Sequence, residues 1–416
     1  MRILQVSPLD AYPPAAGGEH RVHGLVSEFP SENGEVIRIA QGGIVANHDP
    51  LSGDLRYERR IESGYLELRP RNPVYDLVRL PRLVGIPGLL FLSEDRVFWN
   101  RNRIGELLAW ADLVFCEGPW QVPAVLRHDP VVPLLYSSHN VEFDRAIQSR
   151  SRFLNRWAAK RVRRIESKAV AESQMVLCVS REDAMRFERL YGSDTPKLVA
   201  ANATYSKKLE FATGTSTGRD QEGFDNDTIM GVFVGSDYAP NKDAAVQLVN
   251  LAPTIRESVP TFELWILGAC GRAIGDPPPG VNVTGFVEEI DRYLAAADVA
   301  FNPVTHGGGT NIKLFDYFAH GLPVLTTPFG ARGIDLVHTK EAIITEVDKF
   351  PEWVERLVID RGLAHRLGRR GRELIRERYT WDQVSRTLLG DLRVAFDHGN
   401  HTDPDMDAVD PDRVVR

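Results

Sequence analysis

Short apolar runs alternate along the chain with segments whose apolar positions recur at helical spacing. In the first half, these runs predict buried strands at 1–7, 36–40, 111–116, 134–138, 175–179 and 198–201. In the second half, they predict strands at 229–234, 262–267, 281–284, 299–302, 324–326 and 342–344. Helices are expected at 155–172, 181–190, 242–251, 290–296, 352–359, 362–377 and 381–396. The alternation predicts an α/β protein with two parallel sheets that face each other.

A polar stretch separates the two halves. Residues 207–227 are rich in Gly, Thr and Asp, which is typical of an interdomain linker. We therefore expect an N-terminal domain of residues 1–206 and a C-terminal domain of residues 228–378. The tail, residues 399–416, is rich in Asp and Pro and is expected to be disordered.

The stretch 301–330 has the order of a βαβ unit: strand, glycine loop, helix, glycine stop, strand. Its loop contains three consecutive glycines, 307–309, whose backbone N–H groups can approach an anion at a helix N-terminus. Lys313 is expected about one turn inside that helix, with Asp316 three residues on and on the same face. The pattern suits a phosphate with hydroxyl groups nearby. An ordinary βα turn is the alternative, because the Gly-Lys-Ser/Thr ending of a P-loop is missing.

Two polar features follow apolar strands of the first half. The pair Gly17-Gly18 comes between the first strand and a helix-like segment, and His139 comes directly after strand 134–138. Doubly wound folds bind ligands at the carboxyl ends of their strands, and histidine exchanges protons near neutral pH. Turn glycines and a structural histidine are the alternatives. A GxGxxG motif is absent, so a Rossmann oxidoreductase is poorly supported.

Charge and composition narrow the function classes. With 416 residues, a net charge of −7 and a pI near 5.9, the chain is long enough for two domains, and nonspecific nucleic-acid binding is not favoured. Three scattered cysteines and a short apolar N-terminus indicate a cytoplasmic protein. Asp-x-Asp triplets occur only in the linker and the tail, so no metal site is expected.

Two segments leave membrane contact open. Residues 76–98 are apolar with flanking basic residues, and they read either as a core helix or as a surface segment that touches lipid. The basic stretch 155–172 is either a solvated helix face or a surface for anionic lipid or a phosphate-bearing acceptor. The apolar run 77–92 is broken by Arg and Pro, so it does not read as a transmembrane span. The protein is expected in the cytoplasm, with the inner face of the membrane as the alternative.

Ordered motifs carry a family resemblance. The second half resembles retaining GT-B glycosyltransferases of the family 4 type through six motifs: FVGSDYAPNKDA (233–244), LWILG (264–268), VTGFV (283–287), LAAADVAFNPV (294–304), GGGTNIKLFDYFAHGLPVLTT (307–327) and FGARGI (329–334). Weaker matches are the glycine pair, SSHNVE (137–142) and CVSREDA (178–184). The resemblance implies two Rossmann-like domains facing across a cleft, with a last helix, 380–398, that crosses back to the N-terminal domain.

The resemblance also implies a donor and site residues. The donor is expected to be a nucleoside diphosphate sugar, used without a cofactor or metal, and the acceptor a hydroxyl of a glycan, glycolipid or lipid-linked saccharide. His139, Lys313 and Asp316 are the catalytic candidates: His139 contacts the sugar or acceptor, Lys313 the diphosphate, and Asp316 the ribose. The donor-binding candidates are Gly17, Gly18, Gly235, Ser236, Lys242, Gly285, Phe286, Val287, His306, Gly307, Gly308, Gly309, Thr310 and Asn311.

Several positions depart from the family pattern. Gly308 stands where the first acid of the family's Glu-x7-Glu pair is expected, and Asp316 replaces the second Glu. Ser236 replaces a frequent Arg, and Asn241 occupies a Lys position, with Lys242 adjacent. His306 or backbone groups are expected to take over from the missing acid. A nucleotide-sugar epimerase or hydrolase of the same fold, or a non-catalytic scaffold, is therefore an alternative to a transferase.

Overall fold

The computed structural model describes residues 1–9, 12–14, 17–40, 58–68, 101–148, 152–192, 194–210, 225, 227–396 and 414–415. The chain divides into two compact units, here called unit 1 (Met1–Ala201 with Val384–Arg416) and unit 2 (Asn202–Gln383). The predicted linker lies largely outside the described residues, and Ser206–Glu210 is a 3₁₀ helix within unit 2. The segment 76–98 also lies outside the described residues.

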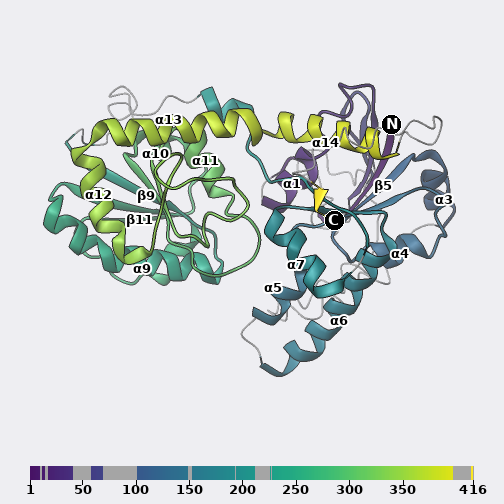
Figure 1. Ribbon diagram of the computed structural model, residues 1–416, viewed down its shortest axis with the longest axis horizontal. Helices are drawn as coiled ribbons and strands as arrows, with labels where there is room; N and C mark the ends of the chain where they lie inside the picture. Colours follow the sequence, from purple (N-terminus) through teal and green to yellow (C-terminus); the bar gives the residue numbers. More distant parts are fainter. Residues whose placement is uncertain are drawn as a thin grey trace, which may run out of the picture. The chain divides into compact units, whose positions relative to one another are not determined.

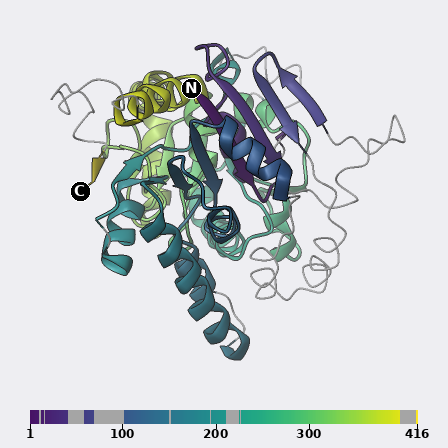
Figure 2. The ribbon, with the colours of Figure 1, turned by 90° about the vertical axis from the view of Figure 1, so that its right-hand side faces the viewer.

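Unit 1 is built on a nine-stranded sheet among the described residues, in the order β15-β8-β7-β6-β5-β1-β2-β4-β3. Its strands are β1 Arg2–Ser7, β2 Glu35–Ala40, β3 Glu58–Glu62, β4 Tyr65–Leu68, β5 Leu113–Glu117, β6 Leu134–Ser137, β7 Met175–Cys178, β8 Lys197–Val199 and β15 Val414–Val415. Only the pairs β3–β4 and β15–β8 in this described sheet are antiparallel. Figure 2 shows β1, β2 and the β3–β4 hairpin side by side.

The centre of this sheet is buried on both faces. Every residue of β5 and β6 is buried, as the near-continuous apolar runs predict. The chain runs from β1 to β2 on one side and later places β5 on the other side of β1. This reversal of strand order is the position at which open α/β sheets bind ligands, at the carboxyl ends of the strands.

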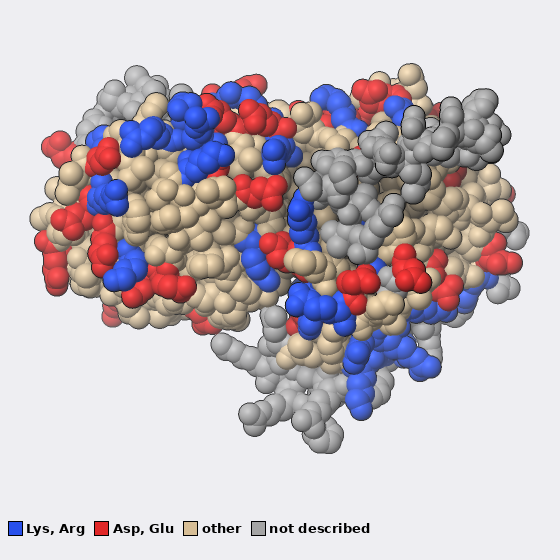
Figure 3. Space-filling model, viewed as in Figure 1, with Lys and Arg blue, Asp and Glu red and all other residues tan. Residues whose placement is uncertain are grey.

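The helices of unit 1 are α1 Gly17–Gly24, α3 Arg101–Trp110, α4 Val122–Leu126, α5 Glu142–Gln148, α6 Arg152–Glu172 and α7 Arg181–Tyr191. On α6, Val162, Ala169 and Val170 are buried. Basic side chains in the part of α6 from residue 159 onward lie on its solvent side, and Figure 3 shows basic residues gathered where this helix lies. Exposed among them are Lys160, Arg163, Arg164 and Lys168.

Unit 2 is built on a six-stranded parallel sheet in the order β11-β10-β9-β12-β13-β14 among the described residues. Its strands are β9 Ile229–Val234, β10 Phe262–Leu267, β11 Val281–Gly285, β12 Val299–Asn302, β13 Val324–Thr326 and β14 Ile343–Ile344. Its helices are α9 Ala239–Ser258, α10 Asp291–Ala296, α11 Lys313–Ala319, α12 Phe350–Ile359 and α13 Arg361–Arg378 (Figure 1). The strand order reverses between β9 and β12, so a second ligand position is expected there.

The last helix, α14 Trp381–Phe396, begins among residues of unit 2 and continues into unit 1. Within unit 1 it is fixed to Glu28, whose backbone N–H donates to Ser385 Oγ at 3.0 Å and whose carboxylate accepts from Arg386 at 2.8 Å. This is the helix that the sequence predicts at 380–398. Of the predicted disordered tail, residues 399–413 and 416 lie outside the described residues, whereas Val414–Val415 pair with β8.

Candidate functional site

A pocket opens at the strand reversal of unit 2. It is a small pocket that lies where β9 and β12 end. Its lining residues are Tyr238, Pro240, Asn241, Val304, His306, Gly307, Gly308, Gly309, Asn311 and Phe329. The structure therefore brings the glycine loop together with the segment that follows β9, two motifs far apart in the sequence.

The glycine loop is held in a non-helical shape. Gly307 and Gly309 have φ angles of 130° and 70°, which side chains with a Cβ rarely adopt. Behind the loop, the Asn311 side-chain amide donates to the Gly330 carbonyl at 3.0 Å, and Asn302 donates to the same oxygen at 3.1 Å. The Asn311 side chain thus fixes the loop.

Lys313 is the first residue of α11, so its expected place one turn inside the helix is wrong. The reason is the left-handed backbone at Gly309 together with the fixed Asn311 side chain, which delay the start of the helix. The Lys313 ammonium donates to Asn241 Oδ1 at 2.8 Å and lies 4.2 Å from the ring centroid of Phe233. Burial lowers the pKa of Lys313 to about 7, although the nearby Cys270 acts in the opposite direction.

Asn241 links Lys313 to the end of β9. Its Nδ2 donates to Ser236 Oγ at 3.1 Å, while its Oδ1 accepts from Lys313. Gly235 lies under this contact: a Cβ there would come within 2.7 Å of Cys270 Sγ. Lys242 forms an ion pair with Asp237. Asn241, at the family's Lys position, therefore lines the pocket, and the adjacent Lys242 does not.

Asp316 is directed to a different set of partners from Lys313. Its Oδ1 accepts from Thr204 Oγ1 at 3.0 Å and lies 3.0 Å from Lys208 Nζ, which is also 3.5 Å from Asp291. Burial opposes the charge of Lys208, but the two carboxylates outweigh it and raise the pKa of Lys208. The Oδ1 atom of Asp316 is thus occupied within unit 2, and Oδ2 is the oxygen outside these contacts.

The remaining candidates of unit 2 include exposed side chains. His306 Nε2 is 3.3 Å from Asp243 Oδ2, and both side chains are about half exposed. No acid replaces the one missing at Gly308 among the residues that line the pocket. At the end of β11, Gly285 has a φ of 70°, and the next side chain, Phe286, is 82% exposed. A phenyl ring so exposed is unusual for a soluble domain and is available for stacking.

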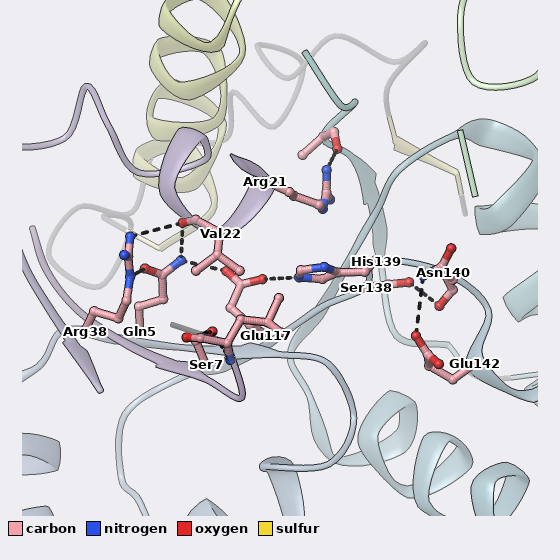
Figure 4. Close-up of polar contacts among 12 residues, drawn as sticks. Gln5, Ser7, Arg21, Val22, Arg38, Glu117, Ser138, His139, Asn140 and Glu142 are labelled. Carbon is pink, nitrogen blue, oxygen red and sulfur yellow. Dashed lines mark hydrogen bonds and ion pairs between the residues drawn. The ribbon is translucent and has the colours of Figure 1, made fainter. Parts of the chain in front are cut away.

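In unit 1, His139 meets a buried carboxylate. His139 Nε2 lies 2.9 Å from Glu117 Oε2, and the Glu117 side chain is completely buried (Figure 4). Glu117 ends β5, and His139 follows β6, so the pairing of these parallel strands brings the two together. Burial opposes the charge of Glu117, but the hydrogen bonds from His139 and Gln5, with the charge of Arg21, outweigh it and lower the pKa of Glu117.

A chain of buried polar groups continues from Glu117 across the sheet. Gln5 Nε2 donates to Glu117 Oε1 at 2.7 Å, and Arg38 Nε donates to Gln5 Oε1 at 2.9 Å. Arg38 also forms an ion pair with Glu67 at 3.0 Å, and both side chains have no exposed surface. Figure 4 shows Arg38, Gln5, Glu117 and His139 in a row. We refer to these residues with Glu67 as the polar chain.

The predicted glycine pair lies beside His139. A Cβ on Gly18 would lie 3.5 Å from His139 Nδ1 and 2.9 Å from Leu9 Cδ1, so glycine allows this close approach. Leu9 is held by Ser7, whose Oγ accepts from the Leu9 N–H at 3.0 Å. Gly18 and His139, predicted separately from their strand ends, are thus neighbours in unit 1.

Reasoning from the sequence missed the polar chain and the Lys208 contacts. Glu117 directly follows the apolar run 111–116, so the strand-end argument that selected His139 could have selected Glu117 as well. Gln5, Arg38 and Glu67 stand within strands, where only their alternation with apolar neighbours sets them apart. Lys208 lies in the stretch expected to be a linker, so nothing in the sequence indicated its contact with Asp316.

Two kinds of structure are absent from the described part of the chain. No helix there is both long and apolar enough to cross a membrane. No group of three His, Cys, Asp or Glu side chains there is close enough to hold a metal ion.

Comparisons with known proteins match both units. The family described as "Glycosyl transferases group 1" matches residues 229–360, and the family described as "Glycosyltransferase Family 4" matches residues 16–200. The GDP-mannose-dependent alpha-(1-6)-phosphatidylinositol monomannoside mannosyltransferase of Mycobacterium tuberculosis is 29% identical over 170 residues. The match covers 35% of this chain and 43% of that protein, so the chain spans less than half of this curated relative.

Solved structures agree on the fold. Sucrose-phosphate synthase from Thermosynechococcus elongatus has a TM-score of 0.67 at 14% identity, over 96% of this chain and 100% of that chain. HepE from Anabaena in complex with UDP-glucose has a TM-score of 0.63 at 13% identity, over 94% of this chain and 99% of that chain. At such identities the likeness shows the fold, which is GT-B. The chain therefore has a Glycosyltransferase Family 4 domain in its first half and a Glycosyl transferases group 1 domain in its second, on a GT-B fold.

Proposed function

We propose that this glycosyltransferase moves a sugar from a nucleoside diphosphate sugar to a hydroxyl group of an acceptor, with retention of configuration. The observation that carries the proposal is the pocket of unit 2, which the glycine loop lines together with Asn241, the hydrogen-bond partner of the Lys313 ammonium. Among the described residues Lys313 has Asn241 as its hydrogen-bond partner and forms no ion pair. A partly buried cation that no carboxylate balances favours an anionic ligand.

The donor is assigned to groups of unit 2. The backbone amides of Gly308, Gly309 and Thr310 and the ammonium of Lys313 bind the diphosphate. Asp316 binds the ribose hydroxyls through Oδ2, since Oδ1 is held by Lys208 and Thr204. Aromatic stacking by the exposed Phe286 holds the base. Each of these assignments follows the family motif and agrees with the position of the residue within its unit.

The reaction is assigned to the donor's own phosphate and to preorganised charges. The bond between the sugar's anomeric carbon and the diphosphate oxygen breaks, and the electron pair stays on that oxygen. The acceptor oxygen attacks the same face, and its proton passes to the leaving phosphate. Lys313 and the loop amides stabilise the growing negative charge, and fixed donors of this type typically contribute about 10²–10³-fold in rate. Neither a metal nor a cofactor has a part in this proposal.

The acceptor is a glycan, glycolipid or lipid-linked saccharide. The name of the mycobacterial relative includes GDP-mannose and a phosphatidylinositol monomannoside. The HepE structure, which is similar in fold, is a complex with UDP-glucose. For this chain we propose a peripheral contact with the inner face of a membrane through α6. Its exposed Lys160, Arg164 and Lys168 form no ion pair among the described residues, and such a face attracts anionic lipid.

A binding experiment tests the donor assignment. The unfolding temperature of the protein is measured with a panel of nucleotides, nucleotide sugars and NAD(H), because a ligand that binds only the folded state raises it. We expect a nucleoside diphosphate sugar to stabilise the wild type and to stabilise Lys313→Ala much less. Lys242 is partly exposed and paired with Asp237, so Lys242→Ala is the matched control and should keep the shift. Stabilisation by NAD(H) alone, or equal shifts in all three proteins, would contradict the proposal.

A further inference from the structure

We propose that the polar chain of unit 1 fixes the tautomer of His139, so that Nε2 carries the proton and the bare Nδ1 accepts a hydrogen bond from a saccharide hydroxyl. Glu117, Gln5 and Arg38 are then positioning residues that act through His139. The identity of the ligand as a saccharide rests on the proposed function. The tautomer itself does not, because it follows from contacts within unit 1.

Arg38 determines which group donates in each hydrogen bond of the polar chain. A guanidinium has N–H donors and no acceptor, so Gln5 presents its oxygen to Arg38 Nε at 2.9 Å. The Gln5 amide nitrogen therefore points the other way, and it donates to the Val22 carbonyl at 2.8 Å and to Glu117 Oε1 at 2.7 Å. A backbone carbonyl only accepts, so the contact with Val22 fixes the same orientation independently. Figure 4 shows these contacts from Arg38 to His139.

Glu117 in turn determines which nitrogen of His139 donates. Glu117 is completely buried, accepts a hydrogen bond from Gln5 and lies near the charge of Arg21, so it is an acceptor-only carboxylate. His139 Nε2, 2.9 Å from Glu117 Oε2, must therefore donate. The carboxylates of Glu117 and Glu67 in the polar chain are accompanied by the buried guanidiniums of Arg38 and Arg21.

The other nitrogen of His139 faces the glycine pair. A Cβ at Gly18 would lie 3.5 Å from Nδ1. The His139 side chain is 16% exposed, whereas that of Glu117 is fully buried, so solvent or a ligand reaches the imidazole and not the carboxylate. With its proton on Nε2, the imidazole offers a lone pair at this edge. A hydroxyl of the transferred or accepting sugar is the donor that suits this lone pair.

Glu117→Gln tests the assignment of donors and acceptors in the polar chain. Gln5 still requires an acceptor, so the oxygen of the new amide faces Gln5 and its NH₂ group faces His139 Nε2. The histidine must then accept at Nε2, which moves its proton to Nδ1. The variant keeps the size and hydrogen-bonding capacity of residue 117 but replaces the acceptor at the sugar by a donor. Glu172→Gln on the exposed end of α6 is the matched control.

The readout is the ¹⁵N NMR spectrum of the histidine side chains, which distinguishes protonated from bare ring nitrogens. The signals of His139 are assigned by their loss in His139→Asn. We expect Nε2–H in the wild type and in Glu172→Gln, and Nδ1–H in Glu117→Gln. Nδ1–H in the wild type, or a doubly protonated ring at neutral pH, would overturn the proposal, and this measurement needs no variant of Glu117 and no substrate.

Activity separates the two nitrogens further. The amide of Asn overlaps the position of Nδ1 and the longer Gln reaches the position of Nε2, so we expect His139→Asn to retain at least tenfold more transfer than His139→Gln. Glu117→Gln should lower kcat more than it raises KM. Equal losses in the two His139 variants would contradict a role for Nδ1. If no variant and no wild type transfers sugar while the tautomers are as expected, the proposed function fails and the inference about His139 stands.

Discussion

Binding of the donor should take up a proton through Lys313. In the free protein, burial lowers the pKa of Lys313 to about 7 from an ordinary 10.5. Among the described residues its ammonium has one hydrogen-bond partner, Asn241, and a cation–π contact with Phe233. A diphosphate placed against this nitrogen favours the charged form and raises the pKa again. The complex therefore holds more protons than the free protein at any pH above about 7.

The magnitude follows from the pKa of the free protein. At pH 8, about nine in ten Lys313 side chains are unprotonated before binding, so about 0.9 proton is taken up per site. At pH 6, about 0.1 proton is taken up. The affinity for the donor is therefore greatest below pH 7 and falls by about tenfold for each pH unit above 7.

Isothermal titration calorimetry in buffers of different ionisation enthalpy measures this number. A nucleoside diphosphate sugar is the suitable ligand, because its two phosphates do not titrate near neutral pH. We expect the uptake to vanish in Lys313→Gln and to persist in the control Lys242→Gln, whose ion pair with Asp237 lies outside the pocket lining. Binding without proton uptake at pH 8, or equal uptake in Lys313→Gln, would refute the reasoning.

Three further variants test other parts of the site. Asp316→Asn should weaken nucleotide affinity about tenfold, and a 2′,3′-dideoxy nucleotide should bind the wild type and the variant equally; a persisting difference would exclude a ribose contact. Gly18→Ala should lower transfer without lowering the unfolding temperature, because its methyl group would crowd Leu9 and His139, and unchanged kinetics would contradict this. Glu67→Gln leaves Arg38 buried without its ion pair and should reduce the free energy of unfolding by about 3–5 kcal/mol in urea; a loss below about 1 kcal/mol would show the pair to be dispensable.

The sequence predicts most of the two sheets because their strands are buried on both faces. Ile229–Val234, Phe262–Leu267 and Val299–Asn302 appear at their predicted bounds. The hairpin of β3 and β4 was missed, since the residues of β3 alternate between exposed and half-buried positions and are mostly charged. Its apolar signal is too weak to separate it from a loop.

The candidate site likewise has a part that the sequence predicts and a part that it does not. The glycine loop, His139 and Lys313 are local signals, each next to an apolar strand, and the structure places the loop and Asn241 in one pocket. The polar chain joins four neighbouring strands and could not be predicted, because strand order across a sheet depends on tertiary packing. The contact between Lys208 and Asp316 likewise joins residues more than a hundred positions apart.

The central claim is that the chain transfers a sugar from a nucleoside diphosphate donor with retention, and ¹H NMR of the anomeric proton tests it most directly. The donor that stabilises the protein is incubated with and without a pool of saccharide and lipid-linked acceptors. The account predicts donor consumption that depends on the acceptor and a product with the anomeric configuration of the donor. Consumption that proceeds equally without an acceptor, or a product of inverted configuration, would contradict it.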